Sequence, residues 1–275
     1  MATHNQVRLI GYLTKKPIVL NENKPGEEKI LMNIKTARRE ADGYRGEYYC
    51  DVIVYYSGDE LMPKLKTYDQ FDIVDIKGVF MVLPTMRKSI CPACGAINYK
   101  ENAVSTFVYP QSVTRLGSYT EFYDNKLETP DSLLMKNYQE NSNQCLIIGT
   151  VITDPQYIAG DVDLCRYGLG VDRKYYVKEQ AEQHSDYPWV YSYGEQAEWD
   201  AKYLRKKSVI LMDGFIHNEW YKADKVCKAC NHKYIVDEVG TQFTPYSIEY
   251  LSGYMTDETL QKEAELAKLA AMADK

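Results

Sequence analysis

The chain repeats itself at an interval of 136 to 138 residues, and this repeat constrains its architecture more than any other feature. Residues 5–11 (Asn-Gln-Val-Arg-Leu-Ile-Gly) reappear as residues 143–149 (Asn-Gln-Cys-Leu-Ile-Ile-Gly), an offset of 138. Further landmarks recur in the same order at an offset of 136: Gly78 with Gly214, Cys91 and Cys94 with Cys227 and Cys230, and Phe107 with Phe243. Short changes in loop length explain the drift of two residues. We therefore expect a duplicated domain.

Composition supports a globular protein of two domains. The chain has 275 residues, of which 45% are hydrophobic and 26% charged. It contains no apolar run of about eighteen residues, which a membrane span would need, and its N-terminal residues lack a secretory signal pattern. We therefore expect a cytoplasmic protein, in the host cytoplasm if a phage encodes it.

Each repeat reads as five short strands with one helical element between the third and fourth. In the first repeat the strand candidates are residues 7–13, 30–36, 48–55, 73–82 and 104–113, which are rich in β-branched and aromatic side chains. The helical elements are residues 59–65 and, in the second repeat, 196–204. This order is that of the OB-fold, a five-stranded Greek-key barrel that binds oligonucleotides. The alternative is an unrelated five-stranded barrel or sandwich.

The sequence thus predicts a mainly β protein with two tandem OB-folds. We place the first domain at residues 1–116 and the second at residues 143–255. Residues 117–142, acidic and without periodicity, read as a linker. Residues 256–275 read as a C-terminal helix with Thr256 as its N-cap, packed on the second domain, frayed in solvent or docked on a partner.

Residues 193–214 resemble the helix and fourth strand of bacterial single-stranded DNA-binding proteins. Residues 5–14 with Pro17, and residues 48–54, are similar to the first and third strands of the same family. The resemblance covers both repeats. It implies sequence-independent binding of single-stranded DNA during replication or recombination, contacts with replication proteins, and a homodimer that brings four OB-folds together.

The chain departs from the common family form in three respects. It carries two OB-folds, its C-terminus lacks an acidic-hydrophobic tip, and it contains Cys-x-x-Cys insertions. These departures point to a phage or mobile-element variant.

Aromatic and basic residues gather at matching places of the two repeats, as single-strand binding needs. Tyrosine is the unusual residue, with 25 of the 34 aromatic side chains. The net charge of −6 argues against a general polyanion binder but allows cations confined to a groove. Trp189 aligns with Ile53 of the first repeat. The candidate DNA-binding residues are Lys35, Arg38, Arg39, Tyr44, Arg45, Tyr48, Tyr49, Arg173, Lys174, Tyr175, Tyr176, Lys178, Trp189, Trp220 and Tyr221.

Two Cys-x-x-Cys pairs, Cys91 with Cys94 and Cys227 with Cys230, have the form of zinc knuckles between the fourth and fifth strands. One solution is a single structural Zn²⁺ site formed by all four cysteines, which would clamp the repeats together. Separate sites completed by His232, by carboxylates or by another subunit are the second solution. Unmetallated knuckles or a disulfide are the third. Cys50, Cys145 and Cys165 lie in strand patterns and are expected to be buried.

The sequence contains no catalytic grouping, so an enzyme is disfavoured. Two rivals to single-stranded DNA binding remain: a replisome scaffold that uses OB-folds and zinc knuckles for protein docking, and an RNA-binding module. Aromatic and basic residues repeated on equivalent strands favour DNA.

Overall fold

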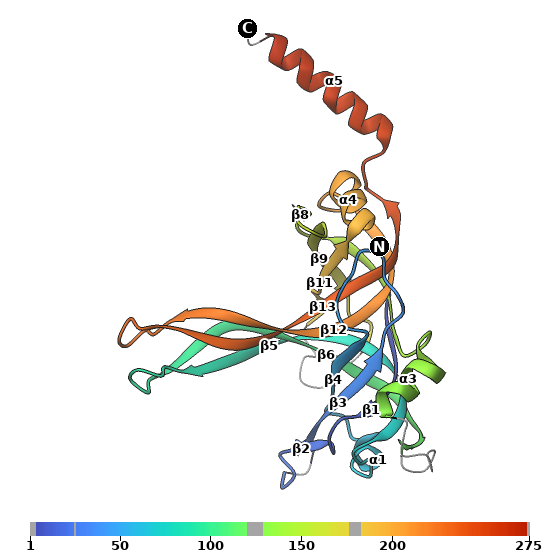
Figure 1. The fold of residues 1–275 in the computed structure, drawn as a ribbon, viewed down its shortest axis with the longest axis vertical. Coiled ribbons are helices and arrows are strands. Elements are labelled where there is room, and N and C mark those ends of the chain that lie inside the picture. The colour runs from blue at the N-terminus through green and yellow to red at the C-terminus, as the bar shows by residue number, and fades with distance from the viewer. Residues whose placement is uncertain (1–3, 25, 120–128, 176–182, 274–275) are drawn as a thin grey trace.

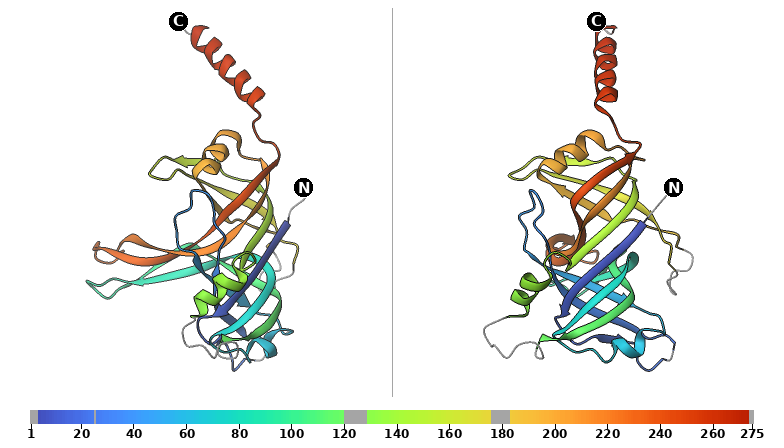
Figure 2. Two further views of the ribbon diagram at one scale, coloured as in Figure 1. Left: turned by 45° about the vertical axis from the view of Figure 1, so that its right-hand side comes forward. Right: turned by 90° about the vertical axis from the view of Figure 1, so that its right-hand side faces the viewer.

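The computed structural model describes residues 4–24, 26–119, 129–175 and 183–273 of the chain. Two barrels are stacked along the long axis of the molecule, and a long arm of β-hairpins projects sideways from their junction (Figure 1). The two further views show the same arrangement (Figure 2).

The first barrel is a closed ring of five strands. These are β1 (His4–Leu13), β3 (Lys29–Ala37), β4 (Tyr49–Tyr56), β5 (Asp72–Ile90) and β6 (Ile97–Ser118). β1 pairs with both β3 and β5, β3 pairs with β4, β4 pairs with β6 in parallel, and β5 pairs with β6. The short strand β2 (Ile18–Leu20) lies beside β3, and helix α1 (Met62–Leu65) separates β4 from β5.

The second barrel repeats this order. Its strands are β7 (Asn143–Val151), β9 (Leu164–Asp172), β11 (Trp189–Tyr193), β12 (Val209–Val226) and β13 (Lys233–Ser252). Two short strands, β8 (Gln156–Ile158) and β10 (Ser185–Asp186), pair with β9, and helix α4 (Gly194–Tyr203) lies between β11 and β12. β11 and β13 form the parallel pair, as β4 and β6 do in the first barrel. The expectation of two tandem OB-folds is confirmed.

The first strands of the two barrels join them. β1 and β7 run antiparallel, and Val7 faces Cys145. These two residues are also equivalents in the repeat, being 138 positions apart. The barrels are therefore related by a pseudo-two-fold axis at this residue pair, and one continuous sheet runs through both.

The repeated Asn of the first-strand motif has the same structural role in both copies. The Asn5 side chain donates to the Phe80 carbonyl and accepts from the Phe80 amide, at 2.9 and 3.0 Å. Asn143 makes the same two contacts with Ile216, at 2.8 and 3.1 Å. In each repeat the asparagine side-chain amide continues the strand pairing beyond the last backbone pair, which explains why the motif begins with Asn.

Two glycines mark where β5 and β12 leave their barrels. Register shifts occur at Gly78 and Gly214, which are also the last residues of these strands to pair with β1 and β7. A Cβ atom at Gly78 would lie 2.2 Å from the Tyr109 carbonyl oxygen, and one at Gly214 would lie 2.4 Å from that of Thr244. Only glycine permits these bulges.

Beyond the bulges the two hairpins extend well past the barrels. We call residues 83–105 and 219–241 the arm. The Cys-x-x-Cys pairs, expected in loops, lie at the two hairpin tips (Figure 1).

Buried aliphatic and aromatic side chains form one core that passes from barrel to barrel. Phe80 and Phe243 meet edge-to-face at the junction, with centroids 4.9 Å apart. Cys50, Cys145 and Cys165 are buried, as expected. The continuous core fixes the placement of the two barrels.

The segment expected as a linker contains helix α3 (Pro130–Tyr138). Thr129 caps it, and Leu133 and Leu134 pack against Tyr12 and Ile73 of the first barrel. The C-terminal helix α5 (Asp257–Ala273) begins as expected, because the Thr256 hydroxyl accepts from the Thr259 amide at 3.2 Å. It points away from the second barrel, as Figure 1 shows, rather than packing on it.

Candidate nucleic-acid interface and metal centre

The four cysteines of the arm tips lie together. Their Sγ atoms are within 4.8 Å of one another. Cys91 lies 3.8 Å from Cys230, and Cys94 lies 3.7 Å from Cys227. Four thiolates at Zn–S distances of about 2.3 Å would be about 3.8 Å apart in a tetrahedron. The arrangement thus matches the shared site, and neither cysteine pair depends on His232.

The two tips have the same turn. The Cys91 amide donates to the Ala96 carbonyl, and the Cys227 amide donates to the His232 carbonyl, both at 2.9 Å. Gly95 and its repeat equivalent Asn231 adopt left-handed φ angles of 70° and 58°. Glycine and asparagine are the residues that accept this conformation most readily.

Asn98, which the sequence did not indicate, connects the two tips. Its Oδ1 accepts from the Lys228 amide at 2.9 Å, so its Nδ2 faces the Cys227 sulfur at 3.5 Å. This hydrogen bond, together with those from the Cys230 and Ala229 amides, lowers the pKa of Cys227 and favours the thiolate that a metal binds. No spacing rule would have found Asn98, because Cys227 and Lys228, the partners that join the tips, come from the other repeat.

A groove of about 620 Å³ lies at the foot of the arm and crosses the pseudo-two-fold axis. Equivalent strand segments of both repeats line it, including Ile53 and its counterpart Trp189. Its aromatic and basic lining residues are Phe107, Tyr187, Trp189, Tyr191, Tyr221, Arg87, Lys100 and Arg166. Such a lining can stack bases and bind phosphates.

The two repeats contribute unequally to this groove. Trp189 and Tyr187 of the second repeat are 39% and 55% exposed. The equivalent positions in the first repeat are Ile53 and Asp51, which offer no aromatic face. At these two positions, therefore, only the second repeat places aromatic rings in the groove, whereas the first repeat contributes Phe107 from β6.

The loop after β3 folds back on itself. Arg38 is 2% exposed, and its guanidinium donates to the backbone carbonyls of Glu47, Arg39 and Gly46 at 2.7 to 2.9 Å. It also stacks on Tyr44, 4.7 Å from the ring centroid. Arg38 thus holds the loop instead of lying on the surface as expected.

The same loop docks on the second barrel. The Tyr44 ring lies 5.0 Å from that of Tyr193 and 5.4 Å from that of Phe215. Arg39 donates to Asp213 at 2.9 Å and stacks on Tyr246 at 4.1 Å. Tyr44 and Arg39, expected to meet DNA, therefore join the repeats.

Burial makes His217, which faces this loop, a weak base. His217 is 6% exposed, and its ring nitrogens face the hydroxyls of Tyr44 at 3.5 Å and Thr244 at 3.3 Å. Burial, with a further contribution from the positive Arg38, lowers the pKa of His217 from 6.5 to about 4. The folded protein therefore keeps this imidazole neutral.

We expect the protein to lose stability between pH 6.5 and about 4 because of His217. In this window the unfolded chain takes up a proton that the folded chain does not, which lowers the free energy of unfolding by up to about 3 kcal/mol. Replacing His217 with Gln should flatten the decline, measured by urea unfolding at several pH values. The exposed His184, replaced with Gln, is the control. Equal slopes in the wild type and the His217→Gln protein would contradict the assignment.

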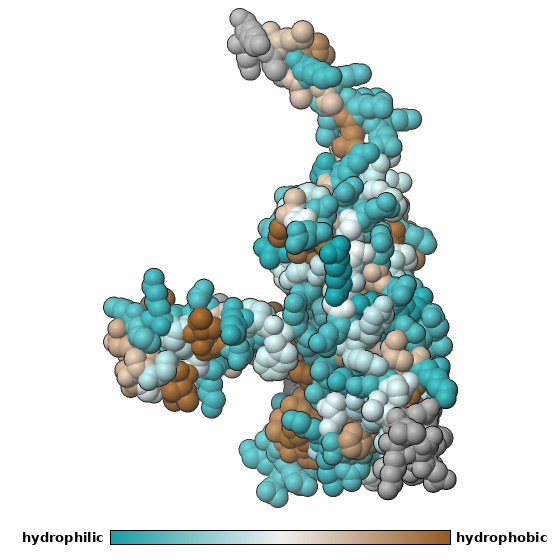
Figure 3. All heavy atoms as spheres, viewed as in Figure 1, coloured by the Kyte–Doolittle hydropathy of each residue, from teal (hydrophilic) through white to brown (hydrophobic). Residues whose placement is uncertain are grey.

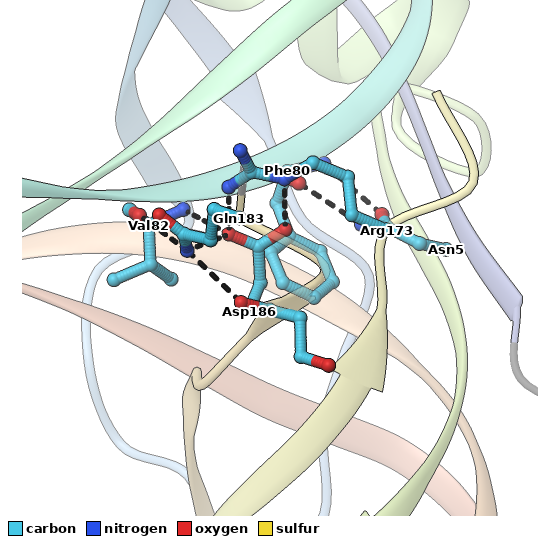
Figure 4. A network of polar contacts seen from close by, with 7 residues as sticks. Asn5, Phe80, Val82, Arg173, Gln183 and Asp186 are labelled. Carbon is cyan, nitrogen blue, oxygen red and sulfur yellow. Dashed lines mark hydrogen bonds and ion pairs between the residues drawn. The ribbon is translucent and has the colours of Figure 1, made fainter. Parts of the chain in front are cut away.

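Arg173 of the second repeat is also internal. Its side chain is 4% exposed and pairs with the fully buried Asp186. Asp186 in turn accepts from the Val82 amide of the first repeat at 2.8 Å, and Gln183 donates to the Val82 carbonyl at 3.3 Å (Figure 4). Arg173 therefore stabilises the junction at the foot of the arm and does not face solvent.

The remaining candidates are distributed over several surfaces. Lys174 and Tyr175 are exposed beyond β9, whereas Tyr176 and Lys178 lie outside the described residues. Arg45 and Tyr48 are exposed in the folded-back loop, while Lys35 and Tyr49 are half-buried beside Asp131. Trp220 and Tyr221 lie on the arm, 70% and 45% exposed.

Sequence reasoning missed several residues of the groove. Tyr187, Tyr191 and Arg166 line it beside Trp189. Tyr191 pairs with Arg166 across β11 and β9. The aromatic pattern at residues 187, 189 and 191, which places three rings on one strand face, was the available signal.

Comparison with known proteins agrees with this architecture. Residues 142–242 match the sequence model of the Single-strand binding protein family. The match covers most of the second repeat. It confirms the resemblance that the sequence motifs indicated.

Among curated proteins, Single-stranded DNA-binding protein 2 of Clostridium acetobutylicum is 28% identical to the chain over 103 residues. That alignment covers 36% of this chain and 73% of the relative. Crystal structures of the single-stranded DNA-binding protein of Thermus aquaticus, wild type and a deletion mutant, each superpose with a TM-score of 0.59. They are 16% and 17% identical and cover 94% and 93% of this chain and 97% and 98% of their own. This likeness shows that the fold of the family extends over both repeats.

Among the described residues, no helix has the length and apolar character that crossing a membrane requires.

Proposed function

We propose that the protein binds single-stranded DNA without regard to sequence, in the groove at the foot of the arm. The observation that carries this proposal is a set of three rings, Tyr187 just before β11 and Trp189 and Tyr191 on it, that line one groove with Arg166. Stacking on aromatic rings is sequence-tolerant because every base has a π-face. The name of the Clostridium relative and the family match support the same ligand.

The exposed candidates outside the groove extend this proposal. Lys174 and Tyr175 follow the strand that carries Arg166, and Arg45 and Tyr48 lie in the first repeat's loop. We assign them to the margins of the DNA path. We assign the buried Arg38 and Arg173 and the half-buried Arg39 and Tyr44 to the support of this surface rather than to contact with DNA.

Replacing Trp189 with Ala is expected to weaken binding of oligo(dT) about tenfold, because a stacked base contributes about 1 to 3 kcal/mol. The measurement is a fluorescence anisotropy titration with labelled oligo(dT) at several salt concentrations. Trp199→Ala is the control, since Trp199 is also exposed but lies on α4, away from the groove. Oligo(rU) and duplex DNA complete the series. Equal affinity for duplex DNA would refute the proposal, stronger binding of oligo(rU) would favour an RNA-binding module, and no binding at all would favour a docking scaffold.

We place the protein in replication or recombination, encoded by a phage or mobile element. The cysteine-bearing arm supports this placement, because it departs from the common family form. A homodimer would bring four barrels together, and replication proteins are the partners we propose.

We also propose that the cluster of Cys91, Cys94, Cys227 and Cys230 holds one structural Zn²⁺. Four sulfur donors and no fifth protein ligand are typical of closed structural zinc sites. When bound, the ion supplies a cross-link between the two hairpin tips. Its effect is therefore to hold the arm together rather than to catalyse a reaction.

A further inference from the structure

The two hairpins of the arm meet through polar contacts. Glu238 of the second hairpin, 6% exposed, binds Lys100 at 3.0 Å and Arg87 at 3.5 Å from the first. The hydroxyls of Ser89 and Tyr234 lie 2.8 Å apart. Ion pairs with solvent-exposed members contribute little to stability, and an isolated two-stranded hairpin is marginally stable in water. The contacts at the tips are therefore important for holding the hairpins together.

The apolar contact between the hairpins is small. Isoleucine and methionine side chains of the arm lie on its outside, and those more than half exposed include Met86, Ile90, Ile97 and Ile235. Figure 3 shows hydrophobic residues on the surface of the arm. The buried apolar cluster at the tips consists of Cys91, Cys227 and Tyr234, with two partly buried residues packed against it. A reaction at the cysteines therefore acts directly on the contact that joins the hairpins.

One cysteine of each pair is exposed and the other is buried. Cys94 and Cys230 are exposed, whereas Cys91 and Cys227 are 1% and 0% exposed. The oxidation of a cysteine depends on the exposure of its sulfur. A small oxidant such as hydrogen peroxide can therefore reach one cysteine of each hairpin while the arm stays folded.

The contacts between sulfurs run from one hairpin to the other. The Cys94 sulfur lies 3.7 Å from that of the buried Cys227, and the Cys230 sulfur lies 3.8 Å from that of the buried Cys91. Asn98 of the first hairpin reinforces this placement, because its side chain contacts the Cys227 sulfur at 3.5 Å. Each exposed cysteine thus has a buried partner on the opposite hairpin, as an oxidised cysteine and its resolving cysteine require.

We propose that the cysteine cluster is a peroxide-sensitive latch, in which oxidation replaces the zinc cross-link between the hairpins with two disulfides, Cys94–Cys227 and Cys91–Cys230. The arm then stays closed when the cluster no longer holds zinc. A thiol reductant restores the four thiols by thiol–disulfide exchange. This proposal rests on the proposed function of the cluster as a zinc site, since it adds a regulation of that site.

The reaction consumes one hydrogen peroxide for each disulfide. The Cys94 sulfur attacks a peroxide oxygen, the O–O bond breaks, and a sulfenic acid and water form. The Cys227 sulfur then attacks the sulfenic sulfur, the S–O bond breaks, and the hydroxyl group leaves as water. In both steps the leaving oxygen takes a proton from the thiol or, where a thiolate held zinc, from solvent. Cys230 and Cys91 react in the same way, so the thiols are oxidised and the peroxide is reduced to water.

Peptide mapping without a reductant distinguishes the possible disulfides. Trypsin cleaves after lysine and arginine, so both cysteines of the first pair stay on residues 89–100. Those of the second pair are separated onto residues 226–228 and 229–233. We expect peroxide to release zinc from the full-length protein, to consume the four thiols of the cluster and to join all three peptides. Fragmentation between Cys91 and Cys94 then assigns the partner of each.

Variants and buried cysteines provide the controls for this mapping. Cys94→Ser should lose the link to residues 226–228 and keep the link to residues 229–233. Cys165→Ala should behave as the wild type, because Cys165 is buried outside the cluster. Cys50 and Cys145, which are also buried outside it, should stay reduced in every protein.

Limited proteolysis reports whether the disulfides hold the arm closed. Three states of the full-length protein are compared: with zinc, without zinc and reduced, and without zinc after peroxide treatment. We expect rapid cleavage within residues 83–105 and 219–241 in the reduced zinc-free state alone. Oxidation should return the rate of cleavage to that of the zinc-bound protein, and a thiol reductant should raise it again.

The outcomes separate the latch from the zinc site. Disulfides within each pair, Cys91–Cys94 and Cys227–Cys230, together with an arm that is still cleaved rapidly, would overturn the latch. Thiols that survive a peroxide concentration sufficient to oxidise glutathione, or that are converted to sulfinic acids, would overturn it as well. If the purified protein contains no zinc but peroxide forms the two expected disulfides and protects the arm, the zinc assignment fails while the pairing of the thiols stands.

Discussion

Replacing Cys227 with Ser is expected to reduce the zinc content of the purified protein from about one ion per chain to almost none. Structural zinc sites contribute apparent binding free energies of about 10 to 16 kcal/mol, and the loss of one of four thiolates removes much of that. Cys227 also receives the Asn98 hydrogen bond, so its removal disturbs the contact between the two tips as well. The measurement is elemental analysis of protein purified without added zinc.

The barrels should survive this change. Cys91 and Cys227 belong, with Tyr234, to a small apolar cluster that is separate from the core of the barrels. We therefore expect chelation or Cys227→Ser to expose the arm to proteases, with little change in the thermal unfolding of the barrels. Cys165→Ala is the control, because Cys165 is buried outside the cluster and its loss should leave zinc bound. Two zinc ions per chain, or none with Cys91 and Cys227 freely alkylated, would refute the shared site.

The repeat predicted the barrels because it marks positions that the backbone needs. Asn5 and Asn143 close the same strand pair, and Gly78 and Gly214 form the same bulge. The local backbone geometry requires asparagine or glycine at these positions, so the same residues recur in both repeats and can be recognised in a single sequence. The way the strands pair in each barrel followed from the order of strands and helix along the sequence, which is that of an OB-fold.

The placement of the charged candidates could not be predicted in the same way. Arg38 and Arg173 were expected at the surface because arginine is rarely buried. Arg38 stacks on Phe215 at 5.6 Å, and the partner of Arg173, Asp186, binds the Val82 amide from the other repeat. The direct polar partners of Arg38 and Arg173 are local, but both sites are closed by residues of the other repeat, and no local pattern reports those contacts.

The arm was missed for a related reason. Its strands alternate as the barrel strands do, but their inward residues include Arg87 and Lys100 and their outward residues include Met86 and Ile90. Alternation alone does not say which face is buried. Helix α3 was missed because Leu133 and Leu134 are adjacent, and a short helix shows too little periodicity.

Replacing Asp186 with Ala is expected to lower the free energy of unfolding by about 3 to 5 kcal/mol, the cost of breaking a buried ion pair from one side. Asp186 is fully buried, binds Arg173, and accepts the Val82 amide at 2.8 Å, so the change removes a contact within the second repeat and one between the repeats. Asp186→Asn should be milder, since an amide oxygen can still accept from Val82. Asp257→Ala, which breaks the exposed pair with Lys202, should cost less than about 1 kcal/mol.

The double replacement of Asp186 with Leu and Arg173 with Met tests the cause. Removing both charges eliminates the desolvation penalty, so stability should recover most of the loss if the buried charge of Arg173 is what destabilises the single variant. Urea unfolding of all four variants measures these differences. If the double variant is no more stable than Asp186→Ala, the contact with Val82 rather than the ion pair determines the stability of the junction. Equal effects of Asp186→Ala and Asp257→Ala would contradict any stabilising role for Asp186 at the foot of the arm.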